Sequence, residues 1–154
     1  MAHLFIPKPP DPQLPVFFNL DGVVGASPAA NLQEDVLLIQ FIFSVMGANP
    51  LPTTAASLSA VFKAVSVTGV IDAQTIAAIR AEQQDRKSRT PSTVVDGRVS
   101  PAVGGYTYGG GTYSIAQLNE NLQHRNVGVW PRIDLIPGCP AGLRTMVVRT
   151  VSGT

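Results

Sequence analysis

The side chains that could carry catalysis or bind a metal are few and widely spaced in this sequence. His3 lies in a proline-rich stretch, His124 is expected at a helix end, and Cys139 is the only cysteine. Neither histidine belongs to an HExxH pattern or has a cysteine at ligand spacing, so we expect no zinc site. Cys139 stands in a Gly-Cys-Pro loop without a neighbouring cation in the sequence, which favours an inert buried thiol over a nucleophile.

Acid and serine chemistry have equally little support in the sequence. Glycosidic cleavage needs two carboxyl groups facing each other across a cleft. Helix capping and surface exposure explain the candidate acids better, and these are Glu34, Asp35, Asp72 and Glu82. No GxSxG pattern marks a serine nucleophile. We therefore expect neither an enzyme nor a cofactor, and a hydrolase with a site hidden from sequence inspection is a minor alternative.

Aromatic side chains offer the best candidates for binding a ligand. Their faces can stack on sugar rings or anchor a protein interface. The candidates are Tyr106, Tyr108, Tyr113 and Trp130. The glycine-rich segment 103–112, which holds two of them, lacks the lysine of a GxxxxGK[ST] loop, so a phosphate cradle is not expected. The alternative for each aromatic residue is that it only packs this loop onto the helices.

The composition predicts one domain with a surface that is poor in charge. The chain has 154 residues, and 14% of them are charged, against roughly 25% in an average soluble domain. The mean hydropathy is +0.20. Either the surface is neutral and polar, or part of it is covered by another copy or another protein. The net charge of +1 gives no electrostatic case for nucleic acid.

No targeting or membrane segment is expected. Pro7, Pro9, Pro10 and Pro12 interrupt any apolar region of a signal peptide near the start. The longest apolar run, residues 36–43, is too short to span a bilayer. The localisation is therefore open: the protein is cytoplasmic, or it is exported or carried on a particle by a dedicated route.

The elements that must position any site begin with a helix over residues 73–87. Asp72 is a suitable N-cap because its carboxylate can accept N–H groups of the first turn. Ile71 and Ile76 have the spacing of a hydrophobic staple. Alanines fill the other faces, so this helix can dock closely against a neighbour.

A second helix is predicted over residues 32–46, capped by Asn31 and ended by Gly47. Apolar residues occupy nearly its whole circumference, whereas an ordinary surface helix has one apolar face. Either other parts of this chain cover it, or it forms an interface. The candidate interface residues are Leu37, Leu38, Phe41, Ile42 and Val45.

The remaining elements divide the chain into three parts. Residues 1–30 form a proline-rich arm, extended over residues 1–15, with a short strand at 16–20. Residues 31–102 form a helical domain, with a third helix from Thr53 or Thr54 to about Val65. Residues 103–154 add the glycine–tyrosine loop, a helix over 114–124 with a capping-box start, and a β-type tail over 144–151. That tail could pair with residues 16–20 or be offered to a partner.

Three segments in the middle of the chain follow a known pattern in order. The first segment, residues 36–47, is similar to V-x-x-L-Q-x-x-L-x-x-x-G through Val36, Ile39, Gln40, Phe43 and Gly47. The second, residues 69–83, is similar to D-G-x-x-G-x-x-T-x-x-A-(V/I)-x-x-F-Q through Gly69, Thr75, Ala78, Ile79 and Gln83. The third resembles D-G-x-(V/I)-G-P through Asp96, Gly97, Val99 and Pro101. Together they resemble the peptidoglycan-binding-domain-like family over residues 31–102.

The chain departs from the family pattern at four positions. Thr68 and Asp72 replace an aspartate and a glycine, Ser100 replaces a glycine, and Glu82 stands where the family has phenylalanine. A charge at that core position implies either that the helix end is solvated here or that the register of the match differs.

The resemblance implies a small three-helix bundle over residues 31–102. Together with the short β-type segments and the extended arms at both ends, which lie outside the match, it predicts a mainly α fold. It also implies a module without catalytic residues that helps wall hydrolases hold peptidoglycan. Our first hypothesis is a non-catalytic binding module that holds cell-wall glycan or a protein partner. The alternative is a structural subunit of a larger assembly, a phage-like particle or secretion machinery, in which the terminal arms contact neighbouring subunits. Both hypotheses allow self-association.

Overall fold

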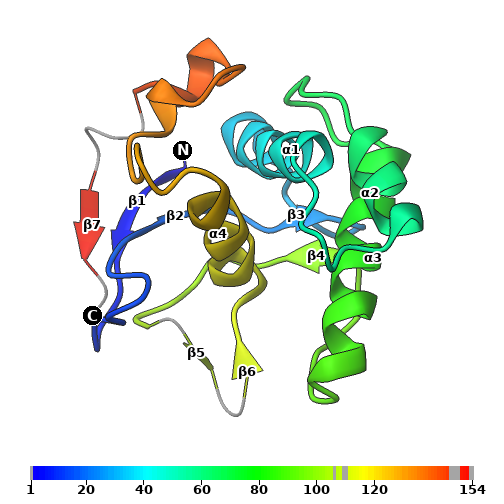
Figure 1. Ribbon diagram of the computed structural model, residues 1–154. Coiled ribbons are helices and arrows are strands. Elements are labelled where there is room, and N and C mark those ends of the chain that lie inside the picture. Colours follow the sequence, from blue (N-terminus) through cyan, green and yellow to red (C-terminus); the bar gives the residue numbers. More distant parts are fainter. Residues whose placement is uncertain (1, 106, 109–110, 146–149, 153–154) are drawn as a thin grey trace.

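The fold is mainly α-helical, and a three-stranded sheet lies to one side of the helices (Figure 1). The structure is a computed structural model that describes residues 2–105, 107–108, 111–145 and 150–152. Its helices are α1 (Gln33–Ala48), α2 (Ala56–Lys63), α3 (Ala73–Arg89), α4 (Ser114–Arg125) and the short 3₁₀ helices η1 (Ile133–Leu135) and η2 (Ala141–Leu143). Its strands are β1 (His3–Ile6), β2 (Phe17–Asn19), β3 (Val24–Gly25), β4 (Arg98–Val99), β5 (Thr107–Tyr108), β6 (Gly111–Thr112) and β7 (Thr150–Ser152).

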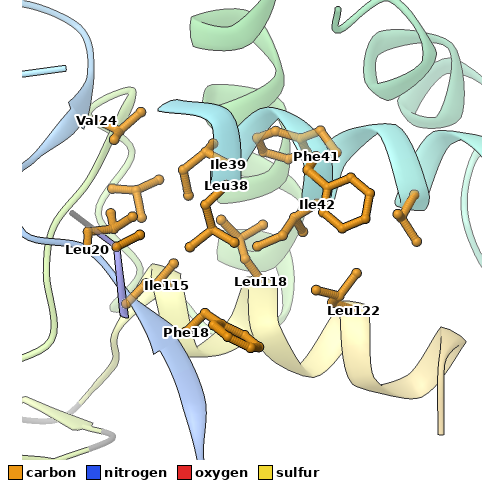
Figure 2. Close-up of a cluster of buried hydrophobic side chains, with 14 of the residues drawn as sticks. Phe18, Leu20, Val24, Leu38, Ile39, Phe41, Ile42, Ile115, Leu118 and Leu122 are labelled. Carbon is orange, nitrogen blue, oxygen red and sulfur yellow. The ribbon is translucent and has the colours of Figure 1, made fainter. Parts of the chain in front are cut away.

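Helix α1 runs through the core and is covered on several sides. It contacts α2, α4, β3 and η2. Figure 2 shows its apolar side chains meeting those of α4 and of the β2 region. The labelled residues of this cluster are Phe18, Leu20, Val24, Leu38, Ile39, Phe41, Ile42, Ile115, Leu118 and Leu122, and all of them are buried. The nearly continuous apolar circumference of α1 therefore reflects a central helix of this chain.

Helix α1 does not start or end as the sequence predicts. Asn31 has a φ of 50° and lies outside the helix, and the N-cap residue is Leu32, which makes no capping hydrogen bond. The side chain of Asn31 instead holds the loop before the helix, accepting from the N–H of Gly25 at 2.7 Å. Gly47 lies within α1, which continues to Ala48. The predicted Asn31 cap and Gly47 stop were therefore wrong.

Gly47 has a packing role instead of a terminating one. A Cβ atom at this position would lie 2.7 Å from the backbone nitrogen of Lys63 and 2.9 Å from the carbonyl carbon of Phe62. Both atoms belong to α2, so α1 and α2 approach each other at backbone distance here. Only glycine permits this approach, and it brings Phe62 to stack on Phe43, with ring centroids 5.2 Å apart.

The other helices follow the predicted periodicity more closely than the predicted caps. Asp72 caps α3 as expected, because its carboxylate accepts the N–H of Thr75 at 2.8 Å. Helix α2 is shorter than predicted and begins after Ala55, without a side-chain cap. Helix α4 begins after Tyr113, and no side chain caps its N-terminus, so the predicted capping box at Ser114 does not form.

The N-terminal segment is a central strand and not a free arm, which corrects the sequence prediction. Strand β1 lies between β2 and β7, in the order β2-β1-β7. It pairs antiparallel with β2, where Leu4 faces Phe18, and parallel with β7. Phe5 is buried against Phe17 at a ring distance of 5.1 Å. The prolines from residue 7 onward end the strand because proline cannot donate a ladder hydrogen bond.

The C-terminal strand pairs differently from the sequence prediction. The expected β-type tail covered residues 144–151, of which 146–149 lie outside the described residues. Strand β7 covers Thr150–Ser152 and pairs with β1, not with residues 16–20. Its neighbour in the sheet is therefore another strand of this chain.

One side chain of α4 completes the other edge of the sheet. Asn119 is fully buried and lies beside β2. Its Oδ1 atom accepts the N–H of Phe18 at 2.8 Å, and its Nδ2 atom donates to the Phe18 carbonyl at 2.9 Å. The carboxamide takes the place of a further strand, which satisfies a buried backbone edge and fixes α4 to the sheet.

Candidate functional site

Three buried polar side chains each hold one turn of the backbone, and two of them orient helix α3. Asp35 on α1 is fully buried and accepts the N–H of Gly22 at 2.8 Å. Gln40, also on α1, accepts from Thr68 and Gly69 at 2.9 Å each. The burial of Asp35 and its contact with Gly22 correct the prediction that Asp35 is a cap or a surface group. Burial raises the pKa of the Asp35 carboxyl, and the hydrogen bonds from Gly22 and Asp21 oppose that rise.

Gln40 positions the start of α3. Its Nε2 atom donates to the Val70 carbonyl at 2.9 Å and to Thr75 Oγ1 at 3.1 Å, while its Oε1 atom accepts from the Thr68–Gly69 turn. Gly69 has a φ of 78°, which glycine adopts readily. All of the hydrogen-bonding capacity of one buried carboxamide is thus used to set where α3 begins relative to α1.

Gln83 makes the same arrangement at the other end of α3. Its Oε1 atom accepts from Asp96 at 3.2 Å and from Gly97 at 2.9 Å, and its Nε2 atom donates to the Arg98 carbonyl at 2.8 Å. Gly97 has a φ of 71°. Gln83 therefore fixes the turn into β4 to α3. The preceding residue, Glu82, does not take part in holding this turn and lines a cleft instead.

Glu82 lies at a cleft between α2, α3 and α4, and the cleft has a volume of about 380 Å³. Its apolar wall comes from Met46 on α1 and from Leu58 and Phe62 on α2. The polar residues that line it are Thr53, Thr54, Glu82, Asp85, Arg86, Arg89, Gln117, Asn121 and Arg125. Three arginines thus face two carboxylates, which leaves the cleft with a positive balance.

The Glu82 carboxyl is buried, so the prediction of a surface group was wrong. It is 8% exposed, and burial raises its pKa to about 7, although the neighbouring Arg86 guanidinium acts in the opposite direction. Arg86 Nε lies 3.4 Å from Glu82 Oε1. The end of α3 is thus not solvated at Glu82. Of the two explanations for a charge at the family's phenylalanine position, a solvated helix end is therefore excluded.

Arg86 ties the cleft to the segment before α4. Its Nη2 atom donates to Ser114 Oγ at 2.7 Å, and its Nη1 atom reaches the Thr112 carbonyl at 3.4 Å. Its Nε atom is buried and makes no hydrogen bond of good geometry, even though it lies beside Glu82. Arg86 therefore links the last turns of α3 to the start of α4.

Helix α4 supplies the facing wall of the cleft. Arg125 donates from Nε to the Asn49 carbonyl at 2.7 Å and from Nη1 to Asn121, and it makes no other hydrogen bond with the part of the chain that the structure describes. The carboxamide of Gln117 makes none with that part at all. Hydrogen-bond donors therefore face the cleft without partners on the described protein, a requirement for holding a ligand.

Of the four predicted aromatic residues, the structure describes the side chains of Tyr113 and Trp130, and these two make no ring contact with each other. Tyr106 lies outside the described residues, and Tyr108 lies on β5, where its side chain is not described. Tyr113 directly precedes α4, and Trp130 follows it. Trp130 packs edge-on against Phe18 at a ring distance of 5.6 Å, so it belongs to the core and not to an aromatic platform with Tyr113.

The predicted interface residues of α1 are covered by this chain, which corrects their interpretation as an exposed face. Leu38, Phe41, Ile42 and Val45 are at most 6% exposed, and Leu37 is half-buried. Exposing the first three would cost about 5–9 kcal/mol, comparable with the whole stability of a small domain. Self-association stays a prediction, but it would need another surface, and light scattering of the purified chain would test it.

Sequence reasoning missed the cleft because its residues come from helices that are far apart in the chain. Of the cleft residues, only Glu82 was marked as unusual in the sequence, because it occupies a position where the resembled family has phenylalanine. No pattern marked Gln117 or Arg125, because their position depends on where α4 packs.

Cys139 is a further sequence candidate that the structure places. Cys139 is buried, and burial raises the pKa of its thiol, although the positive charge of Arg144 opposes this rise. A cation near Cys139 was not expected from the sequence. Among described residues, no cluster of three or more His, Cys, Asp or Glu side chains could hold a metal ion. No helix in the same ranges has the length and apolar character needed to cross a membrane.

Comparisons of the chain with protein-family models, with curated proteins and with solved structures found no match. Any function must therefore be argued from the residues, their contacts and the cleft that they form.

Proposed function

We propose that the chain is a non-catalytic binding module of the peptidoglycan-binding-like class, and that it holds cell-wall glycan or a protein partner in the cleft between α2, α3 and α4. The observation that supports this most is the shared role of Gln40 and Gln83. These are the two glutamines of the family-like segments, and each uses its carboxamide to hold a turn that contains a glycine with positive φ.

This repetition gives the three family-like segments a physical reason to occur in order. The segment with Gln40 holds the turn that begins the second segment, at Gly69. The second segment ends in Gln83, which holds the turn of the third segment, at Gly97. A sequence that keeps both glutamines and both glycines at these spacings keeps the geometry of α1, α3 and β4. The module is then a rigid support, and rigid supports favour binding because little order is lost.

The cleft is the part of this support that suits a ligand. It is concave, it combines an apolar wall with several polar groups, and its volume of about 380 Å³ lies within the range of small-ligand sites. Buried and partly buried charges line it, and such groups concentrate at functional sites. The helices α3 and α4, which carry these groups, are both anchored by buried carboxamides.

Co-sedimentation with purified cell wall tests the proposal. The wild-type chain should pellet with the wall, and Gln117→Trp, which fills the cleft, should abolish this. Gln84→Trp is the matched control, because Gln84 is exposed on α3 and does not line the cleft. If the wild-type chain stays in the supernatant, wall glycan is not the ligand. If both variants pellet like the wild type, the cleft is not the binding site.

A further inference from the structure

The unpartnered donors of the cleft indicate the chemical class of its ligand. Gln117 keeps its full carboxamide, and Arg125 keeps Nη2, free of hydrogen bonds to the described residues. Arg89 is exposed and lines the cleft, and among the described residues its side chain is engaged only by Asp85, at 2.9 Å. Guanidinium and amide N–H groups that line one cleft fit an oxyanion, and the charge-assisted hydrogen bond from an arginine N–H to a carboxylate is among the stronger ones in proteins.

We propose that the cleft binds a carboxylate group, that Gln117 and Arg125 hold this group, and that its binding is coupled to protonation of Glu82. The inference rests on the proposed function, because it assigns the ligand class of the same cleft. The carboxylate could come from the end of a peptide or from an acidic sugar, and both would present the same oxyanion to these donors.

The coupling follows from the charges that face Glu82. Its own helix contributes Asp85, Arg86 and Arg89, and α4 contributes Arg125. The residues of α1 and α2 that line the cleft are uncharged. An incoming carboxylate competes with the Glu82 carboxylate for these arginines. A neutral Glu82 removes the competition, so ligand binding and proton uptake favour each other.

The proton can be exchanged in an accessible pH range. Burial raises the pKa of Glu82 to about 7. A carboxylate ligand is fully ionised well below that pH, so its own titration does not interfere. Affinity should therefore fall as pH rises through neutrality, by about tenfold between pH 6 and pH 8 in the limit where only the neutral form of Glu82 admits the ligand.

The experiment is a titration of the full chain followed by the NMR signals of the Gln117 side-chain amide. Acetyl-alanyl-alanine is compared with its C-terminal amide, and N-acetylmuramic acid is compared with N-acetylglucosamine. Within each pair only the first compound carries a carboxylate. We expect at least one acid to bind and its uncharged partner to fail, and the pair that responds identifies the source. Equal binding of acid and uncharged partner, or no binding by either acid, overturns the proposal.

Two variants test the proton coupling. In Glu82→Gln the affinity for the acid should be the same at both pH values and close to that of the wild type at the lower pH. Asp134→Asn makes the same change of net charge outside the cleft and should keep the wild-type pH dependence. A pH dependence that persists in Glu82→Gln contradicts the coupling.

The outcomes separate this inference from the proposed function. If the chain fails to pellet with cell wall but binds a carboxylate with the expected pH dependence, the wall hypothesis fails and the inference stands. If the chain pellets with wall but neither acid binds, the inference alone fails.

Discussion

The Oε1 atom of Gln83 accepts a hydrogen bond from the backbone N–H of Gly97 at 2.9 Å, and both groups are buried. Gln83→Ala would leave the N–H groups of Asp96 and Gly97 without this partner. A buried donor without a partner costs about 1–3 kcal/mol, so we expect a loss of about 2–4 kcal/mol in the free energy of unfolding. Chemical denaturation measures it. The adjacent and exposed Gln84 is the control, and Gln84→Ala should be nearly neutral. Equal losses of unfolding free energy in Gln83→Ala and Gln84→Ala would contradict the role of Gln83 in holding this turn.

The approach of α1 and α2 at Gly47 gives a prediction in which two effects oppose each other. Helix propensity alone predicts that Gly47→Ala stabilises by about 1 kcal/mol. A Cβ atom would, however, lie 2.7 Å from the backbone of α2, which cannot move aside as a side chain can. We expect the clash to win, with a net loss of about 1–2 kcal/mol in the free energy of unfolding. Gly128→Ala, where a Cβ meets no atom within 4 Å, is the control and should not destabilise.

Burial of Glu82 predicts how stability depends on pH. Its folded-state pKa of about 7 lies above the ordinary value of 4.5, so the folded chain binds this proton more tightly than the unfolded chain. The stabilisation of the folded chain by this proton is complete below the ordinary pKa of 4.5. It is lost as pH rises to and through 7, where the free energy of unfolding has fallen by an amount on the order of 3 kcal/mol. Glu82→Gln should lack this loss. Urea denaturation of both proteins across this range measures the difference, and parallel curves would contradict the assignment.

The position of β1 in the middle of the sheet predicts that residues 1–15 are needed for folding. Their deletion removes the pairing partner of both β2 and β7 and exposes Phe17. We expect the truncated chain to lose its cooperative thermal unfolding transition. An extended arm that packed on nothing could be deleted without this loss. Circular dichroism during heating distinguishes the two results, and deletion of residues 153–154 is the control, because β7 ends at Ser152.

Helix periodicity and one cap could be read from the sequence because they are local. The segments around α1 and α3 carry enough apolar spacing to predict both helices, and Asp72 caps the second of them as expected. The cap at Asn31 failed because that side chain is engaged by Gly25, a contact that no local pattern encodes. Strand β1 was missed because the prolines after it dominated the interpretation of the whole segment.

The candidate site was harder to predict than the fold because it depends on tertiary packing. Glu82 and Arg125 are more than one element apart in the chain, and the cleft forms only when α4 docks on α1 and β2. Aromatic composition favoured Tyr113 and Trp130, yet Trp130 packs on Phe18 against the core. A charge at a core position of the resembled pattern was the one sequence signal that led to the cleft.

The central claim is that this chain holds a ligand in the cleft lined by Glu82, Gln117 and Arg125. The most direct measurement is the fraction of Arg125→Gln that pellets with purified cell wall, compared with Arg132→Gln, which makes the same charge change at an exposed site outside the cleft. We predict that Arg125→Gln remains in the supernatant while Arg132→Gln pellets like the wild type, with both variants folded by circular dichroism. Equal pelleting of the two variants would contradict the account.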